Sequence, residues 1–348
     1  MGINYFKYFF LASMLLFFSC GRNFSRLTTE ENTYSLTTEV DLRDVTHSQQ
    51  IEDFYASGNE GFFQGKEDVK IYYRIFEHPS AEKAILISSG RTEAAIKYKE
   101  LIFDLFNNGY SVYIHDHRGQ GLSGRMTEDP DMGYIDDFQF YVDDMKYFFD
   151  HYLKPNNHDK SYLLTHSMGG AIGMTYLEQY PVDFNAAAFS SPMLGLKPPI
   201  CSVVKVLDGE KPKYAMGESE YDEDKTTFEG NTLTGSELRY DRMIDAYTDV
   251  PKARLGGATY HWLHKSCQQF EYLFSNIDRI NTPFILFSAE NEQIVHPYAH
   301  EKFITAAQEL GKDCVAYEVE NAQHELLIEK DEQRVATIHK TLDFYSKY

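Results

Sequence analysis

Apolar and polar residues alternate along most of the chain in two patterns, one typical of strands and one typical of helices. Short unbroken apolar runs are expected where a strand is buried on both faces of a sheet, and stretches with helical spacing follow them. The expected strands are residues 60–64, 69–76, 84–87, 110–115, 161–164, 184–189, 283–288 and 314–319. The expected helices are residues 48–56, 95–106, 138–153, 168–180, 297–310 and 331–345. The first two strands flank the turn residues 65–68, which predict a hairpin.

The order of these elements predicts an α/β fold, with a mostly parallel sheet and helices on both of its faces. The strand–helix alternation stops between residues 196 and 275, which contain the only tryptophan and a Gly-Gly pair, and resumes afterwards. We therefore expect residues 196–275 to form an inserted helical cap. The surrounding core would consist of residues 56–195 and 276–348.

The N-terminus has a different composition from the rest of the chain. Lys7 is the only charged residue before Cys20, and residues 8–18 are almost entirely apolar. This run is shorter than the roughly 20 residues that span a bilayer, which favours a signal peptide over residues 1–19. The segment Phe17-Phe18-Ser19-Cys20 resembles the cleavage box of bacterial lipoproteins. The resemblance implies lipid attachment to Cys20, and plain secretion is the alternative.

We therefore expect a membrane-anchored lipoprotein of the bacterial cell envelope, in which residues 20–55 form a lipidated cysteine and a polar tether. The net charge of −20 argues against a nucleic-acid partner, because no basic surface is available to neutralise phosphates. It equally argues against adsorption to anionic lipid through charge. The other three cysteines, Cys201, Cys267 and Cys314, are widely spaced, and we expect them to be buried free thiols.

Ser167 lies where an apolar strand stops and a helix begins at once. Such a strand–serine–helix corner is how an α/β-hydrolase exposes a serine nucleophile, and the tight corner favours small residues two positions away. Gly169 meets this requirement. Thr165 does not, since the motif usually has glycine there.

A serine hydroxyl needs a base, and the base needs a carboxylate to orient it. In α/β-hydrolases these groups follow later strands in the order serine, acid, histidine. The segment Asn321-Ala322-Gln323-His324 directly follows the last expected strand, and His324 is the predicted base. Glu292 follows the preceding strand and is the predicted acid, with Glu290 on the same loop as the alternative.

The same chemistry requires two backbone N–H groups to stabilise the negative charge that develops on the substrate oxygen. One is expected to be the amide of Met168, the residue after the nucleophile. The other should come from the loop that follows strand 84–87, where Arg91 stands after Ser89-Gly90.

Four segments of the chain closely resemble bacterial lysophospholipases of the lysophospholipase–monoacylglycerol lipase group. They are Gly90-Arg91-Thr92-Glu93 with Tyr98, the loop from Asp116 to Arg125, the serine corner itself, and Gly256-Gly257-Ala258-Thr259-Tyr260-His261-Trp262 in the cap. The resemblance runs from about residue 60 to the C-terminus. It implies an α/β-hydrolase fold with a cap, a Ser167–His324–Glu292 triad, no cofactor, no metal, and a single-chain lipid substrate.

The residues leave several activities open. A monoacylglycerol lipase or a general carboxylesterase would use the same triad. So would an acyltransferase, and a lipid-binding lipoprotein without activity would result if Thr165 distorted the corner. The headgroup preference, the membrane leaflet and the oligomeric state are not determined by the sequence.

Overall fold

A single nine-stranded sheet organises the chain in the computed structural model, which describes residues 23–80 and 82–348. The strand order is β1-β9-β8-β7-β6-β4-β5-β3-β2. Neighbouring strands are parallel except for the pairs β2–β3 and β3–β5, which are antiparallel. The strands are β1 Ser25–Leu27, β2 Asn59–Gln64, β3 Lys70–Phe76, β4 Lys83–Ser88, β5 Tyr110–His115, β6 Lys160–His166, β7 Ala186–Ser190, β8 Phe284–Ala289 and β9 Cys314–Val319. This is the α/β architecture that the alternating pattern predicts.

Helices cover both faces of the sheet. They are α1 Glu39–Arg43, α2 Val45–Ala56, α3 Lys99–Asn107, α4 Gln139–Phe148, α5 Met168–Gln179, α6 Ile200–Leu207, α7 Glu237–Asp249, α8 Tyr260–Ser275, α9 Pro297–Glu309 and α10 Asp331–Tyr345. Alternate residues of one strand face opposite layers. In β4, Leu86 packs into the core formed with α4, α5 and α9, whereas Ile85 and Ile87 pack into the core formed with α2, α3 and α10.

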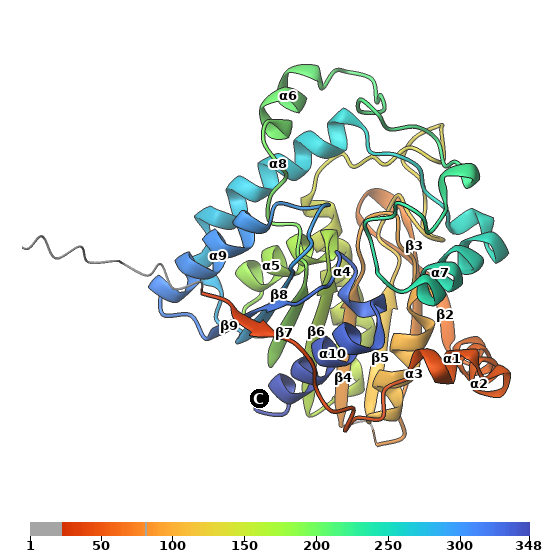
Figure 1. Ribbon diagram of the computed structural model, residues 1–348. Coiled ribbons are helices and arrows are strands. Elements are labelled where there is room, and N and C mark those ends of the chain that lie inside the picture. The colour runs from red at the N-terminus through yellow and green to blue at the C-terminus, as the bar shows by residue number, and fades with distance from the viewer. Residues whose placement is uncertain (1–22, 81) are drawn as a thin grey trace, which may run out of the picture.

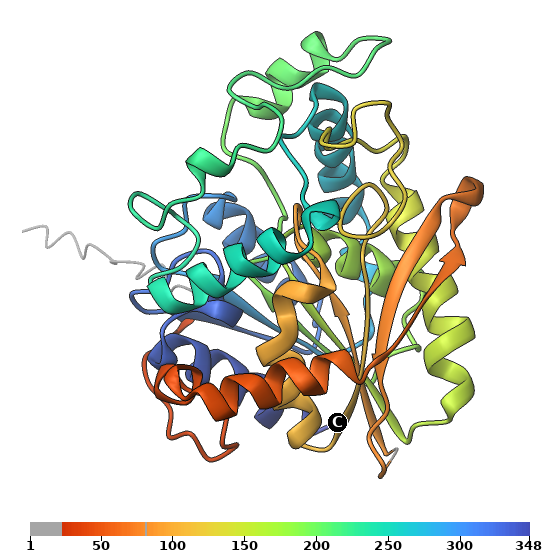
Figure 2. The same cartoon turned by 90° about the vertical axis from the view of Figure 1, so that its right-hand side faces the viewer.

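The cap consists of the helices α6, α7 and α8 and their connecting loops, between β7 and β8. It lies at one end of the sheet, with the C-terminus at the other end (Figures 1 and 2). Helix α8 begins after Thr259, whose side chain accepts a hydrogen bond from the Trp262 amide. The Gly256-Gly257 pair lies just before this helix and links it to the preceding loop.

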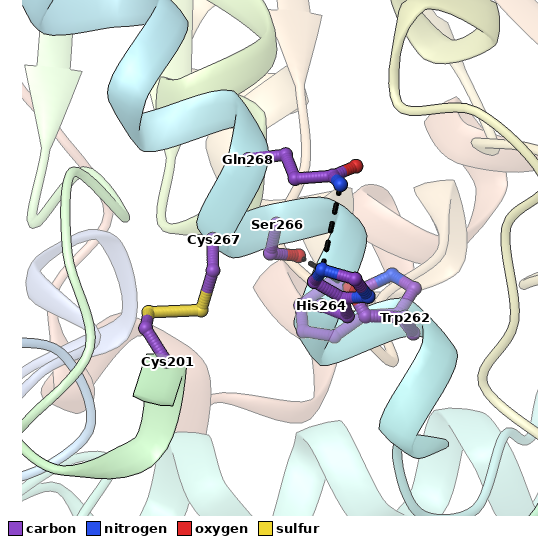
Figure 3. Close-up of a disulfide and its surroundings, with 6 residues drawn as sticks. All are labelled: Cys201, Trp262, His264, Ser266, Cys267 and Gln268. Atoms are coloured by element: carbon purple, nitrogen blue, oxygen red, sulfur yellow. Dashed lines mark hydrogen bonds between the residues drawn. A yellow bond between two sulfur atoms is a disulfide. The ribbon is translucent and has the colours of Figure 1, made fainter. Parts of the chain in front are cut away.

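One prediction about the cap is wrong: Cys201 and Cys267 are not free thiols. They form a disulfide that joins α6 to α8, with their Cα atoms 5.5 Å apart (Figure 3). The two residues are 66 positions apart in sequence, and only the packing of α6 against α8 brings them together. Cys314 is the one free cysteine among the described residues, and it is half-buried.

The N-terminal segment also differs from the expected tether. Residues Ser25–Leu27 form β1, which extends the sheet by pairing in parallel with β9. Further along, Leu36 is buried, and the hydroxyl of Thr37 donates to the carboxylate of Asp104 on α3 at 2.7 Å. The polar residues of this segment therefore find specific partners on the core. The expected signal peptide and Cys20 lie outside the described residues.

No helix within residues 23–80 and 82–348 has both the length and the apolar character needed to cross a membrane.

Candidate active site

Ser167 occupies the sharp corner between β6 and α5. Its backbone has φ 50° and ψ −117°, a strained conformation for a residue with a side chain, and strain of this kind concentrates at functional sites. Three backbone hydrogen bonds hold the corner without using the hydroxyl. The Ser167 amide donates to Ser190 at 3.1 Å, and the Ser167 carbonyl accepts from the amides of Gly170 and Met193, each at 2.8 Å.

The small residues of α5 allow the helix to approach the sheet closely. A Cβ on Gly169 would lie 2.1 Å from the carbonyl oxygen of Ser88, so only glycine fits there. Thr165 is fully buried, and its methyl group would contact a Cβ on Gly173 at 2.7 Å. The bulk that Thr165 adds on the strand is therefore accommodated by a glycine one turn into the helix, and the corner keeps its shape.

The three residues predicted as a triad are in contact. His324 Nε2 lies 3.0 Å from Ser167 Oγ, and His324 Nδ1 lies 2.7 Å from Glu292 Oε2. The carboxylate of Glu292 is acceptor-only, so Nδ1 carries the proton and Nε2 has the free lone pair that faces the serine hydroxyl. All three side chains are almost fully buried. This arrangement is the geometry of an activated serine nucleophile.

Glu292 is held as a carboxylate by its surroundings. Burial raises the pKa of Glu292, but the hydrogen bond and charge of His324, together with the amides of Val295 and Ile294, outweigh it and bring the pKa to about 2. Its Oε1 accepts from the Ile294 amide at 2.8 Å and from the Val295 amide at 3.1 Å.

The alternative acid, Glu290, lies elsewhere. Its carboxylate binds the guanidinium of Arg26 at 2.9 Å and the amide of Asn321 at 2.8 Å, and a third of the side chain is exposed. The structure thus places Glu292, and not Glu290, against His324.

The two predicted oxyanion donors belong to segments in direct contact. The N-terminus of α5, which contains Met168, packs against the start of the 89–94 loop, as the close approach of Gly169 to Ser88 and Ser89 shows. Among the described residues, neither the Met168 amide nor the Arg91 amide donates a hydrogen bond to a protein acceptor. Free N–H groups at a helix N-terminus favour a negatively charged oxygen.

The loop after β5 supports the 89–94 loop, a role that the sequence did not reveal. Gln120 Nε2 donates to the carbonyls of Gly90 at 2.7 Å and Glu93 at 2.8 Å. Asp116 accepts from the amides of Ala95 and Leu122, each at 2.7 Å. The motif from Asp116 to Arg125 is the sequence feature that marks this loop as more than an ordinary turn. Which residues it contacts depends on the tertiary structure.

The cap is tied to the same loop. The guanidinium of Arg91 donates to the carbonyl of Gly256 at 3.0 Å and lies over the ring of Trp262 at 5.5 Å. The cap histidines His261 and His264 both contact the carboxylate of Asp208 at the end of α6, at 3.0 Å and 2.8 Å. They join α8 to α6 near the disulfide, with His264 also facing Gln268 (Figure 3).

A cavity of about 160 Å³ lies between α7 and the loops that carry Arg91 and His324. Thr92 and Glu325, the residues that follow Arg91 and His324, form part of its wall. The tyrosine and aliphatic part of the wall is Tyr221, Leu233, Tyr240, Met243, Ile244, Tyr247 and Leu255, and its polar part also includes Glu93, Lys97, Thr226 and Arg254. The cavity therefore lies next to the residues that follow Arg91 and His324 in the chain, and cap residues form most of its wall.

One group of side chains within the described residues has the spacing of a metal site: Glu93, His166 and Glu325. The ammonium of Lys97 contacts both carboxylates of this group. A lysine therefore already supplies the positive charge that a metal ion would bring.

Known proteins resemble this chain over most of its length. Residues 79–331 match the family described as serine aminopeptidase, S33. Lysophospholipase L2 of Escherichia coli K12 is 35% identical over 312 residues, which cover 86% of this chain and 90% of the relative. The probable lysophospholipase L2 of Haemophilus influenzae is 34% identical over 282 residues, which cover 78% and 87%.

The fold agrees as well. A soluble variant of monoglyceride lipase from Saccharomyces cerevisiae superposes with a TM-score of 0.66 at 19% identity, covering 83% of this chain and 94% of that one. The chain therefore belongs to the serine aminopeptidase S33 family of α/β-hydrolases, and it is an ester hydrolase of the lysophospholipase and monoacylglycerol lipase branch.

Proposed function

We propose that this chain hydrolyses the acyl ester of single-chain lipids, lysophospholipids foremost, through an acyl-enzyme on Ser167. The observation that carries the proposal is the continuous hydrogen-bond chain from Ser167 through His324 to Glu292. The relatives named lysophospholipase L2, which align over most of this chain, support the substrate class.

In the first half-reaction, Ser167 Oγ attacks the ester carbonyl carbon while its proton moves to His324 Nε2. Glu292 stabilises the resulting imidazolium and keeps the proton on Nδ1 in place. The amides of Met168 and Arg91 hold the oxyanion of the tetrahedral intermediate. As the intermediate collapses, the carbon–oxygen bond to the alcohol breaks, and His324 returns the proton to that alcohol.

In the second half-reaction, a water molecule gives a proton to His324 and adds to the acyl carbon. The bond to Ser167 Oγ then breaks, the serine recovers its proton, and the fatty acid leaves. Every proton transfer passes through one imidazole. No step in this sequence needs a metal or a cofactor.

The cap supports a lipid substrate in two ways. The largely apolar cavity beside Thr92 and Glu325 offers space for part of an acyl chain. On the outside, Val203, Val206 and Leu207 are exposed on α6, which favours contact with a lipid aggregate.

A headgroup panel tests the substrate class. Purified protein is given lysophosphatidylcholine and monoacylglycerol with the same acyl chain, and fatty-acid release is measured in each case. We expect a kcat/KM at least about tenfold higher for the lysophospholipid. Equal or reversed values would make the chain a monoacylglycerol lipase or a general esterase, and ester formation exceeding fatty-acid release with added glycerol would make it an acyltransferase.

We further propose that the mature protein is a lipoprotein of the bacterial cell envelope, anchored through Cys20. The apolar run before Cys20 and the lipoprotein-like cleavage box support this. Replacing Cys20 by alanine should move the protein from the membrane fraction to the soluble fraction and remove the mass of the acyl chains. A variant that stays in the membrane fraction with unchanged mass would contradict the anchor.

A further inference from the structure

Four titratable side chains are buried together beside the triad, and the proposed mechanism uses none of them. They are Glu93, Lys97, His166 and Glu325. The side chain of Lys97 is only 1% exposed, and those of Glu93 and Glu325 are 5% and 8% exposed. Charged groups that are this far from water are rare in proteins, and they need close partners of opposite charge.

Lys97 connects the two carboxylates. Its Nζ donates to Glu93 Oε1 at 2.5 Å and to Glu325 Oε2. Glu93 also accepts from the hydroxyl of Tyr98. Burial lowers the pKa of Lys97, but the charges of Glu325 and Glu93 outweigh it and raise the pKa above its usual value. The lysine therefore keeps its positive charge at neutral pH.

The two carboxylates belong to the two loops on which the chemistry depends. Glu93 Oε2 accepts from the amide of Gly90 at 2.5 Å, which fixes the backbone directly before Arg91. Glu325 immediately follows His324, and its own amide donates to the carbonyl of Leu233 in the cap at 2.7 Å. One ammonium group thus joins the 89–94 loop to the 320–325 loop.

The serine corner touches the same cluster. His166 precedes the nucleophile, and its Nε2 lies 3.5 Å from Glu93 Oε1 and 3.9 Å from Glu325 Oε2. The ring centroids of His166 and His324 are 4.8 Å apart. The three segments that carry the nucleophile, the base and the expected oxyanion donor therefore all meet around Lys97.

We propose that Lys97 is a positioning residue, whose ammonium clamps the 89–94 loop and the 320–325 loop in the relative placement that transition-state stabilisation requires. The inference rests on the proposed serine-hydrolase function. Without the ammonium, the two buried carboxylates lose the cation that joins them, one of them takes up a proton, and the charge-assisted hydrogen bonds that hold the two loops together are gone. A displacement of about 1 Å at a catalytic group costs about 100-fold in rate.

The test replaces Lys97 by methionine, which keeps most of the side-chain volume and removes the charge. The substrate is p-nitrophenyl butyrate, a small ester that requires the triad and not a lipid headgroup. Titration with a fluorophosphonate gives the fraction of competent sites. We expect kcat per competent site to fall about 30- to 100-fold, with KM changed by less than about threefold, because the clamp acts on the transition state.

Lys99→Met is the matched control. Lys99 lies two residues away, and its ammonium pairs with the partly exposed carboxylate of Glu52 on α2, which belongs to neither loop. Its kcat should stay within about twofold of the wild type. A Lys97→Met protein with unchanged kcat per competent site would overturn the inference, even if its thermal stability fell. If the wild type itself hydrolyses no ester, the proposed function fails instead.

A double-mutant cycle separates positioning from a general loss of structure, and its Glu325→Gln arm tests the clamp on its own if Lys97→Met does not fold. Glu325→Gln keeps an oxygen that accepts from Lys97 but weakens the clamp, and it should lower kcat about three- to tenfold at nearly unchanged KM. The double variant should be no slower than Lys97→Met alone, because both changes break one connection. Full activity of Glu325→Gln would contradict the clamp. So would a double variant whose loss in kcat equals the product of the two single losses.

Discussion

Replacing Ser167 by alanine is expected to lower ester hydrolysis by about 10⁴-fold or more, at unchanged protein stability. In the proposed mechanism the hydroxyl of Ser167 forms the acyl-enzyme, and removing a nucleophile of this kind abolishes nearly all turnover. The fold should not suffer, because the three hydrogen bonds that hold the corner use the backbone of Ser167 and not its side chain. The measurement is fatty-acid release from lysophosphatidylcholine, with the thermal midpoint recorded alongside.

Two results would contradict the role of Ser167 as the nucleophile. An unchanged rate would show that the nucleophile lies elsewhere. A loss of activity that parallels a loss of folded protein would leave the serine without a demonstrated chemical role, so circular dichroism of each preparation is the necessary control.

The second large effect is expected at Glu292. In a Glu292→Gln variant, two backbone amides compete with His324 for a single remaining side-chain oxygen. The Ile294 and Val295 amides both point at Oε1 and would hold the carbonyl oxygen of glutamine there. The NH₂ group would then face His324 and force the lone pair onto Nδ1, leaving Nε2 protonated and unable to accept the serine proton.

A base in the wrong tautomer costs about 10³- to 10⁴-fold in kcat, and we expect a loss of that size for Glu292→Gln. Glu290→Gln is the matched control, since it lies on the same loop and binds Arg26 and Asn321 instead of His324. Its kcat should stay within about threefold of the wild type. Comparable losses in the two variants would mean that the loop, and not one carboxylate, supports the base.

The meeting of Ser167, His324 and Glu292 could be predicted from the sequence because the three residues follow strongly patterned strands. Ser167 follows β6 directly and His324 lies on the loop after β9, and parallel strands bring their carboxyl ends to one edge of a sheet. The choice between Glu290 and Glu292 was open at that level, since both residues lie on one loop. Only the three-dimensional course of the loop decides which carboxylate faces the histidine.

Features that depend on contacts between distant segments were missed. Cys201 and Cys267 are joined because α6 packs against α8, and no spacing rule predicts that packing. Residues 25–27 have too little apolar pattern to indicate a strand, yet they complete the sheet beside β9. The buried position of Lys97 was not predicted either, because a lysine at the start of a helix pattern is normally exposed. Its two buried partners come from separate loops.

The central claim is that Ser167 is a nucleophile activated by His324, and covalent labelling tests it most directly. Purified wild-type protein is treated with a fluorophosphonate and examined by intact mass and peptide mapping. We expect one adduct per chain, located on Ser167, with labelling at least about 10³-fold slower in a His324→Ala variant. Labelling at another serine, or a rate that does not depend on His324, would contradict it.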